Sequence, residues 1–179
     1  MNIKTTLLFL VFAGINLNAQ NTGLSATEKV VVQHIDKNKA QYEKTSLAIW
    51  ELAELGFQED KSTLLLQNLL KDNGFNVVTG QEGMPTAFIA EFGEGKPIIG
   101  FLAEYDALPG LSQKVSANME PLEERAPGHA CGHHLFGTGS AAAAIALKDW
   151  MIKEKIKGTI RVYGTPAEEG GGGKVFMAR

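Results

Sequence analysis

Three of the four histidines and the only cysteine lie in one short segment, Gly128-His129-Ala130-Cys131-Gly132-His133-His134. Thiolate and imidazole groups bind zinc and similar divalent ions, and carboxylates can complete such a ligand set. In an extended loop, alternate side chains point the same way, so we expect His129, Cys131 and His133 to face one point. The segment predicts a metal site rather than an incidental loop.

Two adjacent glutamates, Glu168 and Glu169, are the second candidate for chemistry. Thr-Pro-Ala precedes them and four glycines follow, which is an unusual composition for a plain surface turn. Beside a metal, one carboxylate can bind the ion while the other accepts a proton from water and later returns it. A third acid, Asp106, follows a predicted strand. It can orient a ligand histidine, bind the ion directly, or cap the following turn.

Two other chemistries compete with this interpretation. Cys131 can be the nucleophile of a cysteine amidase, but a base two residues away in the same loop is poorly oriented for proton transfer, and the glutamate pair is then unused. The glycines before Lys174 resemble part of a phosphate-binding loop, but Val175 stands where Ser or Thr should follow the lysine, and the glutamates would repel phosphate. A metal-binding protein without catalytic activity also stays open.

The elements that must position these residues follow from hydrophobic periodicity and from start and stop signals. A capping box, Ser25 to Glu28, opens a helical stripe that ends near Gly56. Further helices are predicted over 62–73 and 139–155, and strands over 75–78, 86–92, 98–103 and 159–163. The strand at 98–103 is almost continuously apolar, which indicates burial on both faces.

The order of strand, connection, helix and strand over 98–163 is that of a crossover unit with parallel strands. Ligands of open α/β sheets bind outside the carboxyl ends of the strands. We therefore expect the acidic residues after positions 103 and 163 to meet the histidine segment at one edge of the sheet.

Composition and charge narrow the function classes. The chain has 179 residues, 44% of them hydrophobic, and 17 basic against 20 acidic residues give a net charge of −3. This is an ordinary globular composition, and the net negative charge argues against a general nucleic-acid-binding surface, so we expect no nucleic-acid partner.

The first 20 residues have the layout of a secretory signal. Lys4 precedes an apolar run from Leu7 to Ala13, and a small residue, Ala19, stands at the expected cleavage point. The run is too short to span a bilayer, which takes about 20 residues. We therefore expect a signal peptide over 1–19, export to the periplasm or the medium of a bacterial-type cell, and no membrane partner.

Three segments in order, AEYDALPGLSQ, PGHACGHHLFGTGSAAAA and YGTPAEEGGGGK, resemble the metal-dependent amidohydrolases of the aminoacylase and carboxypeptidase clan. Within that clan, the branch formed by the B subunits of aminobenzoyl-glutamate hydrolase is the most similar. The resemblance is strong over 98–179. It implies an α/β fold, namely a three-layer metallopeptidase-type catalytic domain with a mixed, largely parallel sheet flanked by helices. Residues 20–179 would be the N-terminal part of that domain, truncated before a lid and dimerisation domain.

The resemblance also implies the chemistry. Two divalent metal ions, zinc or manganese, would be bound, with Cys131, His133 and Glu169 as ligands. Glu168 would be the general base and Asp106 a supporting catalytic residue, while His129 and His134 receive no ligand role. The implied reaction is hydrolysis of an amide in an N-acyl or N-aroyl amino acid or dipeptide by a metal-activated water. The complete protein would be a homodimer or part of a hetero-oligomer, and the 179-residue chain alone would be inactive.

Overall fold

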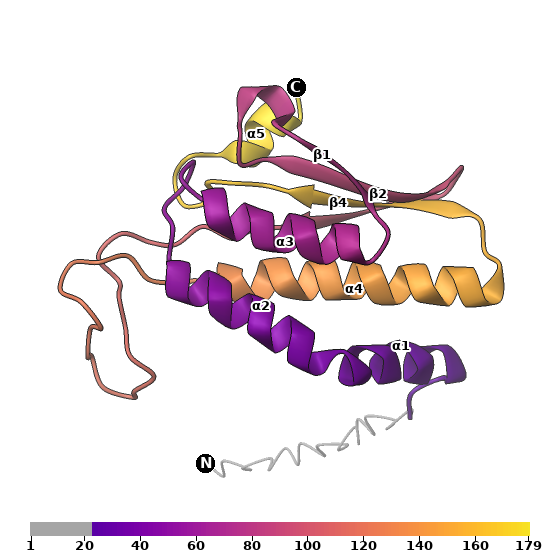
Figure 1. Ribbon diagram of the computed structural model, residues 1–179, viewed down its shortest axis with the longest axis horizontal. Coiled ribbons are helices and arrows are strands. Elements are labelled where there is room, and N and C mark those ends of the chain that lie inside the picture. The colour runs from indigo at the N-terminus through magenta and orange to yellow at the C-terminus, as the bar shows by residue number, and fades with distance from the viewer. Residues whose placement is uncertain (1–22) are drawn as a thin grey trace, which may run out of the picture.

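The computed structural model describes residues 23–179, so the predicted signal peptide lies outside the described residues. The elements in chain order are α1 (Ala26–Lys37), α2 (Lys39–Leu52), α3 (Asp60–Asp72), β1 (Asn76–Thr79), the 3-10 helix η1 (Gln81–Gly83), β2 (Phe88–Glu94), β3 (Ile98–Ala103), α4 (His133–Glu154), β4 (Gly158–Gly164) and α5 (Gly173–Met177). Figure 1 shows the sheet lying over α3 and α4, with α1 and α2 packed beyond α4. No helix among these residues is long and apolar enough to cross a membrane.

The sheet is mixed, as predicted, with the strand order β1-β2-β4-β3. Strands β3 and β4 are parallel and are joined through α4, which confirms the crossover unit. The other two pairings, β1 with β2 and β2 with β4, are antiparallel. The expectation of a largely parallel sheet is therefore wrong for the described strands, because β2 enters the sheet beside β4 and runs against it.

One face of the sheet forms the core. Phe88 and Ala90 of β2 and Ile160 and Val162 of β4 are fully buried. They belong to one hydrophobic cluster with apolar residues of α3 and α4, among them Leu66, Leu70, Ala141 and Ile145. The alanines on the buried side of α4 are small, so the helix can approach the strands closely.

The other face is less covered than the sequence predicts. Ile98, Ile99 and Leu102 of β3 are 44–48% exposed, so burial of this strand on both faces is wrong within residues 23–179. The reason is that β3 is an edge strand of the described sheet, and the long helices pack on one face only. A helical layer on the second face stays a prediction.

Two helix boundaries differ from the predicted ones. The stripe that begins with the Ser25–Glu28 capping box is divided at Asn38, whose side-chain amide donates to the His34 carbonyl oxygen at 2.9 Å. The last long helix, α4, begins at His133 instead of Gly139. The second difference matters for the site, because it places His133 in the first turn of a helix and not in an extended loop.

Candidate metal centre

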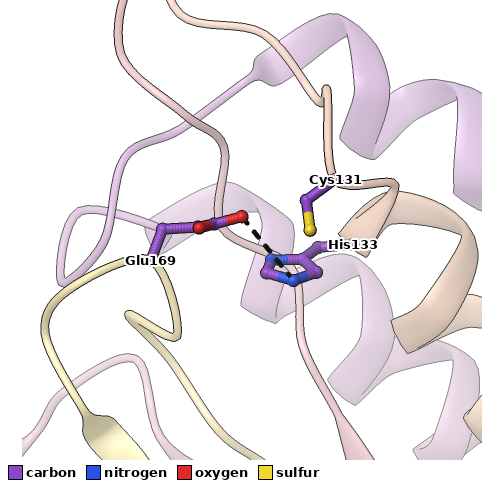
Figure 2. Close-up of side chains that lie close together, drawn as sticks. All are labelled: Cys131, His133 and Glu169. Carbon is purple, nitrogen blue, oxygen red and sulfur yellow. Dashed lines mark ion pairs between the residues drawn. The ribbon is translucent and has the colours of Figure 1, made fainter.

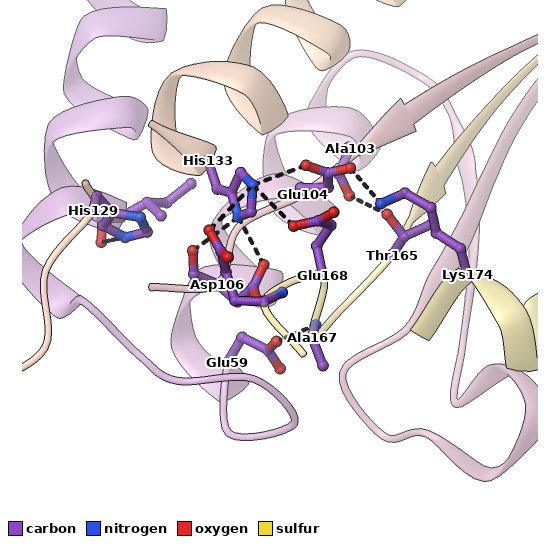
Figure 3. Close-up of polar contacts among 12 residues, drawn as sticks. Glu59, Ala103, Glu104, Asp106, His129, His133, Thr165, Ala167, Glu168 and Lys174 are labelled. Atoms are coloured by element: carbon purple, nitrogen blue, oxygen red, sulfur yellow. Dashed lines mark hydrogen bonds and ion pairs between the residues drawn. The ribbon is translucent and has the colours of Figure 1, made fainter. Parts of the chain in front are cut away.

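The candidate site lies at the carboxyl ends of the parallel strands β3 and β4, next to the first turn of α4. The backbone N–H of Thr165, just after β4, donates to the carbonyl oxygen of Ala103, the last residue of β3, at 2.8 Å. This bond keeps the two loops that follow the strands side by side (Figure 3). The predicted meeting point of the acidic loops and the histidine segment is therefore confirmed.

His133 is the centre of the site. Its buried ring has Nδ1 2.9 Å from Asp106 Oδ1 and Nε2 3.0 Å from Glu104 Oε2. Glu168 Oε2 and Glu169 Oε1 lie 3.7 and 3.9 Å from the same Nε2. The hydrogen bond to Asp106 and the surrounding carboxylates raise the pKa of His133. Because Asp106 occupies Nδ1, Nε2 is the nitrogen that faces the cluster of carboxylates.

Asp106 connects two parts of the site. Its carboxylate is buried, and while Oδ1 contacts His133, Oδ2 accepts the backbone N–H of Glu169 at 2.8 Å. Burial alone would raise the pKa of Asp106, but the hydrogen bonds from His133 and from the Glu169 N–H outweigh burial and lower it. Of the three roles considered from sequence, the geometry matches the orientation of a histidine.

Cys131, His133 and Glu169, the ligand set that the resemblance implies, lie close together. Each offers a ligand atom, and these atoms lie within 4.8 Å of one another (Figure 2). Within residues 23–179, the buried Oε1 of Glu169 has no hydrogen-bond partner. A buried carboxylate oxygen without a donor is unfavourable, and a cation beside it removes the penalty. The three residues therefore fit a divalent ion.

A second group, Glu104, His133 and Glu168, satisfies the same distance limit. Both groups contain His133, and its Nδ1 is already bonded to Asp106. The single remaining imidazole nitrogen can coordinate only one ion, so the described residues do not supply two independent ligand sets.

Glu104 is a site residue for which sequence reasoning found no role. It stands two positions before Asp106, just beyond the end of β3. The alternation of side chains at a strand end is the signal that would have placed both carboxylates on one side. Its other oxygen, Oε1, forms an ion pair with Lys174 of α5, so an ammonium group lies at the rim of the site (Figure 3).

Cys131 is exposed and lies among acidic groups. The adjacent Glu169 carboxylate, followed by the charges of Glu168 and Glu104, raises the pKa of the thiol. A cysteine nucleophile needs the opposite shift, towards thiolate at neutral pH. Carboxylates around a sulfur atom favour a cation at this position, so the geometry supports a ligand more than a nucleophile.

His129 does not join the group, and the expectation that it faces the same point as Cys131 and His133 is wrong. Its Nε2 lies 3.0 Å from the carbonyl oxygen of Ile49 in α2, and its ring packs against His134 with 4.9 Å between centroids. Burial lowers the pKa of His129 to about 4. The side chains of this segment do not alternate as in an extended loop, because the chain enters α4 directly after Cys131 and His133 already lies in the helix.

Several known proteins are similar to this chain in sequence or fold. Residues 100–179 match the model of peptidase family M20/M25/M40. The chain is 44% identical over 146 residues to the B subunit of p-aminobenzoyl-glutamate hydrolase from Escherichia coli K12, an alignment that covers 81% of this chain and 30% of that protein. It is 31% identical over 166 residues to the Xaa-Arg dipeptidase of Mus musculus, covering 86% of this chain and 35% of the relative.

Among solved structures, the chain is similar to a dinuclear metal-binding peptidase of the M20 family from Bacillus subtilis. The TM-score is 0.52 at 26% identity, and the match covers 74% of this chain and 37% of that chain. The chain spans about a third of the length of the curated relatives that it matches.

Proposed function

The chain belongs to peptidase family M20/M25/M40, and from this premise we propose that it carries part of the active site of a metal-dependent amidohydrolase. The observation that supports the proposal best is the set of metal-binding groups around the buried imidazole of His133. His133 Nε2 faces three carboxylates and lies beside a cysteine thiol, while Asp106 bonds the opposite nitrogen. Groups of this kind bind divalent cations.

We assign Cys131, His133 and Glu169 as metal ligands and Glu168 as the general base. Bound divalent ions polarise an amide carbonyl and lower the pKa of water. Glu169 is 17% exposed and has a buried oxygen that no donor among residues 23–179 reaches, which suits a ligand. Glu168 is 41% exposed, so its carboxylate can reach a water molecule, accept its proton, and deliver that proton to the leaving amide nitrogen.

The proposed substrates are N-acyl or N-aroyl amino acids, with aminobenzoyl-glutamate as the first candidate, or dipeptides. The names of the E. coli and mouse relatives support both classes, because each acts on an amide whose product bears a carboxylate. We further propose that zinc or manganese occupies a two-ion site, to which residues outside 1–179 contribute ligands. Residues 20–179 would then be the N-terminal part of a longer catalytic domain.

Assembly and location are separate proposals. The E. coli relative is named as a subunit, which supports a hetero-oligomer, with a homodimer as the alternative. Mass measurement of the purified native complex distinguishes the two. The charged and apolar pattern of residues 1–20 supports export. N-terminal sequencing of the mature protein tests export, and a start at Met1 contradicts it.

The proposed reaction is tested on the native protein that contains this sequence. Aminobenzoyl-glutamate and N-acetyl amino acids are incubated with it, with and without a chelator, while bound metal is measured by elemental analysis. We expect turnover that the chelator abolishes. Glu168→Gln should lower kcat by about 10²–10⁴-fold and retain most of the metal, because it removes a proton acceptor and keeps the shape of the side chain.

Cys131→Ser is the matched comparison, since it removes a ligand and should lose metal together with activity. Equal metal loss in Cys131→Ser and Glu168→Gln would contradict the division of roles. Activity that resists the chelator but is lost on thiol alkylation would favour the cysteine nucleophile. Bound metal without turnover of any amide would indicate a metal-binding protein without catalytic activity.

A further inference from the structure

Glu59, a buried carboxyl that none of the roles above uses, contacts the loop that carries Glu168. Glu59 precedes α3 and is 0% exposed. Its Oε1 accepts the backbone N–H of Ala167 at 2.7 Å, across 108 positions of sequence (Figure 3). Ala167 is the residue immediately before the proposed general base.

The backbone of Ala167 has an unusual conformation, and both its N–H group and its carbonyl oxygen are hydrogen-bonded. Its φ is +53°, in the left-handed region that residues with a Cβ adopt rarely. Its N–H is bonded to Glu59, and its carbonyl oxygen accepts the N–H groups of Gly171 and Gly172 at 3.1 and 2.7 Å. A conformation of this kind persists only where surrounding contacts determine it.

The two backbone N–H groups that flank Glu168 therefore both donate hydrogen bonds to buried carboxyl groups. Ala167 N–H reaches Glu59, and Glu169 N–H reaches Asp106. The Glu168 side chain makes no hydrogen bond of its own to residues 23–179 that would fix its direction. Its position 3.7 Å from His133 Nε2 consequently depends on the backbone on either side.

A purely structural role for Glu59, as the cap of α3, does not match the contacts. Glu59 occupies the N-cap position, but among the described residues its side chain makes no capping hydrogen bond. Glu54 fills that role, because its carboxylate accepts the N–H groups of Lys61 and Ser62 at 3.2 and 2.8 Å. The second oxygen of Glu59 has no hydrogen-bond partner within residues 23–179. The bond to Ala167 is thus the long-range contact that accounts for this buried carboxyl.

We propose that Glu59 is a positioning residue that holds Ala167 in its left-handed conformation and so directs the Glu168 carboxylate towards His133. The proposal rests on the proposed role of Glu168. Its test therefore includes a measurement that needs no activity, namely hydrogen exchange of the Ala167 amide.

The test compares Glu59→Leu and Glu59→Gln in the native metal-loaded protein. Leucine removes the acceptor, whereas glutamine keeps an oxygen that can accept the Ala167 N–H. We expect Glu59→Leu to lose exchange protection at Ala167 and to lower kcat by about 100-fold, with bound metal and KM close to wild type. Glu59→Gln should recover most of the protection and most of kcat.

Glu54→Leu is the matched control, because it removes a neighbouring carboxylate that caps α3 without touching Ala167. It should lower thermal stability and leave both kcat and Ala167 protection near wild type. Wild-type protection or wild-type kcat in Glu59→Leu overturns the proposal. So does equal damage in Glu59→Gln and Glu59→Leu, or an equal loss of kcat in Glu54→Leu. If the wild-type protein hydrolyses no amide, the proposed function fails, and the exchange measurement alone decides the role of Glu59.

Discussion

The loop after β4 and the connection between Leu108 and Gly128 are both irregular, but different hydrogen bonds hold them. In the loop after β4, the N–H groups of Ala167 and Glu169 bond to buried carboxyl groups that are 108 and 63 positions away. The tip of the connection bonds mainly to itself, as in the bond from Lys114 N–H to Glu120 O at 2.8 Å.

The two segments also differ in how deeply their residues are buried. Ala167 is 1% exposed, whereas Val115 and Met119 at the tip are 98% and 93% exposed. In Figure 1 the connection extends away from the helices and the sheet. The conformation of an irregular segment is therefore well fixed where distant buried groups accept its backbone hydrogen bonds. It is weakly fixed where the segment bonds mainly to itself. The segment with long-range bonds is the one that carries the candidate chemistry.

The largest expected loss of metal affinity in this comparison comes from breaking a long-range bond in the site. Asp106→Asn keeps one oxygen, but its amide nitrogen places a donor where two acceptor oxygens are needed, opposite the ring of His133 and the N–H of Glu169. We expect metal affinity to fall by about 10- to 100-fold, as for other residues that orient a histidine ligand. Titration of the metal-free protein with zinc measures the change, and unchanged affinity would contradict the orienting role.

The same variant has a pH signature in the metal-free protein. The pKa of Asp106 is lowered from its ordinary value of 3.8, so its stabilising effect is lost as the pH falls through the folded-state pKa. The pKa of His133 is raised from 6.5, so its effect is lost as the pH rises through the folded-state pKa. Asp106→Asn should therefore lower the free energy of unfolding most between pH 3.8 and 6.5. A difference that does not vary with pH would exclude the ion pair as its source.

The next expected effect is on stability alone, where α4 packs against the end of β3. A Cβ at Gly137 would lie 2.2 Å from the carbonyl oxygen of Glu104, while one at Gly139 in the same helix would meet no atom of the described part of the chain within 4 Å. Gly137→Ala should destabilise the protein by about 1–3 kcal/mol through overpacking. The control Gly139→Ala should stabilise it by about 0.5–1 kcal/mol through helix propensity. Equal effects of the two substitutions in chemical denaturation would show that the contact with Glu104 is not limiting.

The smallest effect is expected in the connection. Replacing both Val115 and Met119 by serine should change the free energy of unfolding by no more than about 0.5 kcal/mol, because both side chains are almost fully exposed. Metal affinity should not change. Thermal or chemical denaturation of the double variant measures the effect, and a loss above about 1 kcal/mol would mean that the tip is packed against another surface.

Local signals in the sequence determined the elements and the types of ligand. Periodicity and the capping box placed most helices and strands within a few residues, although they missed the start of α4 at His133 and the division of the first stripe at Asn38. The crossover rule brought the acidic loops to the histidine segment. The clustered histidines and cysteine and the Glu168–Glu169 pair indicated a metal site, and the resemblance to the amidohydrolase clan selected Cys131, His133 and Glu169 as its ligands. The elements and the clusters depend on neighbours in sequence or on a topological rule, so they can be derived without coordinates.

Only the tertiary structure decided which side chains share a site. It turned His129 towards Ile49, brought Glu104 to His133, and linked Glu59 to Ala167. The direction of β2 in the sheet and the exposed face of β3 were decided in the same way. The physical reason is that each outcome depends on a hydrogen bond or packing contact between segments far apart in the chain. Hydrophobic periodicity and turn signals describe only the local preferences of each segment, so they cannot contain these contacts.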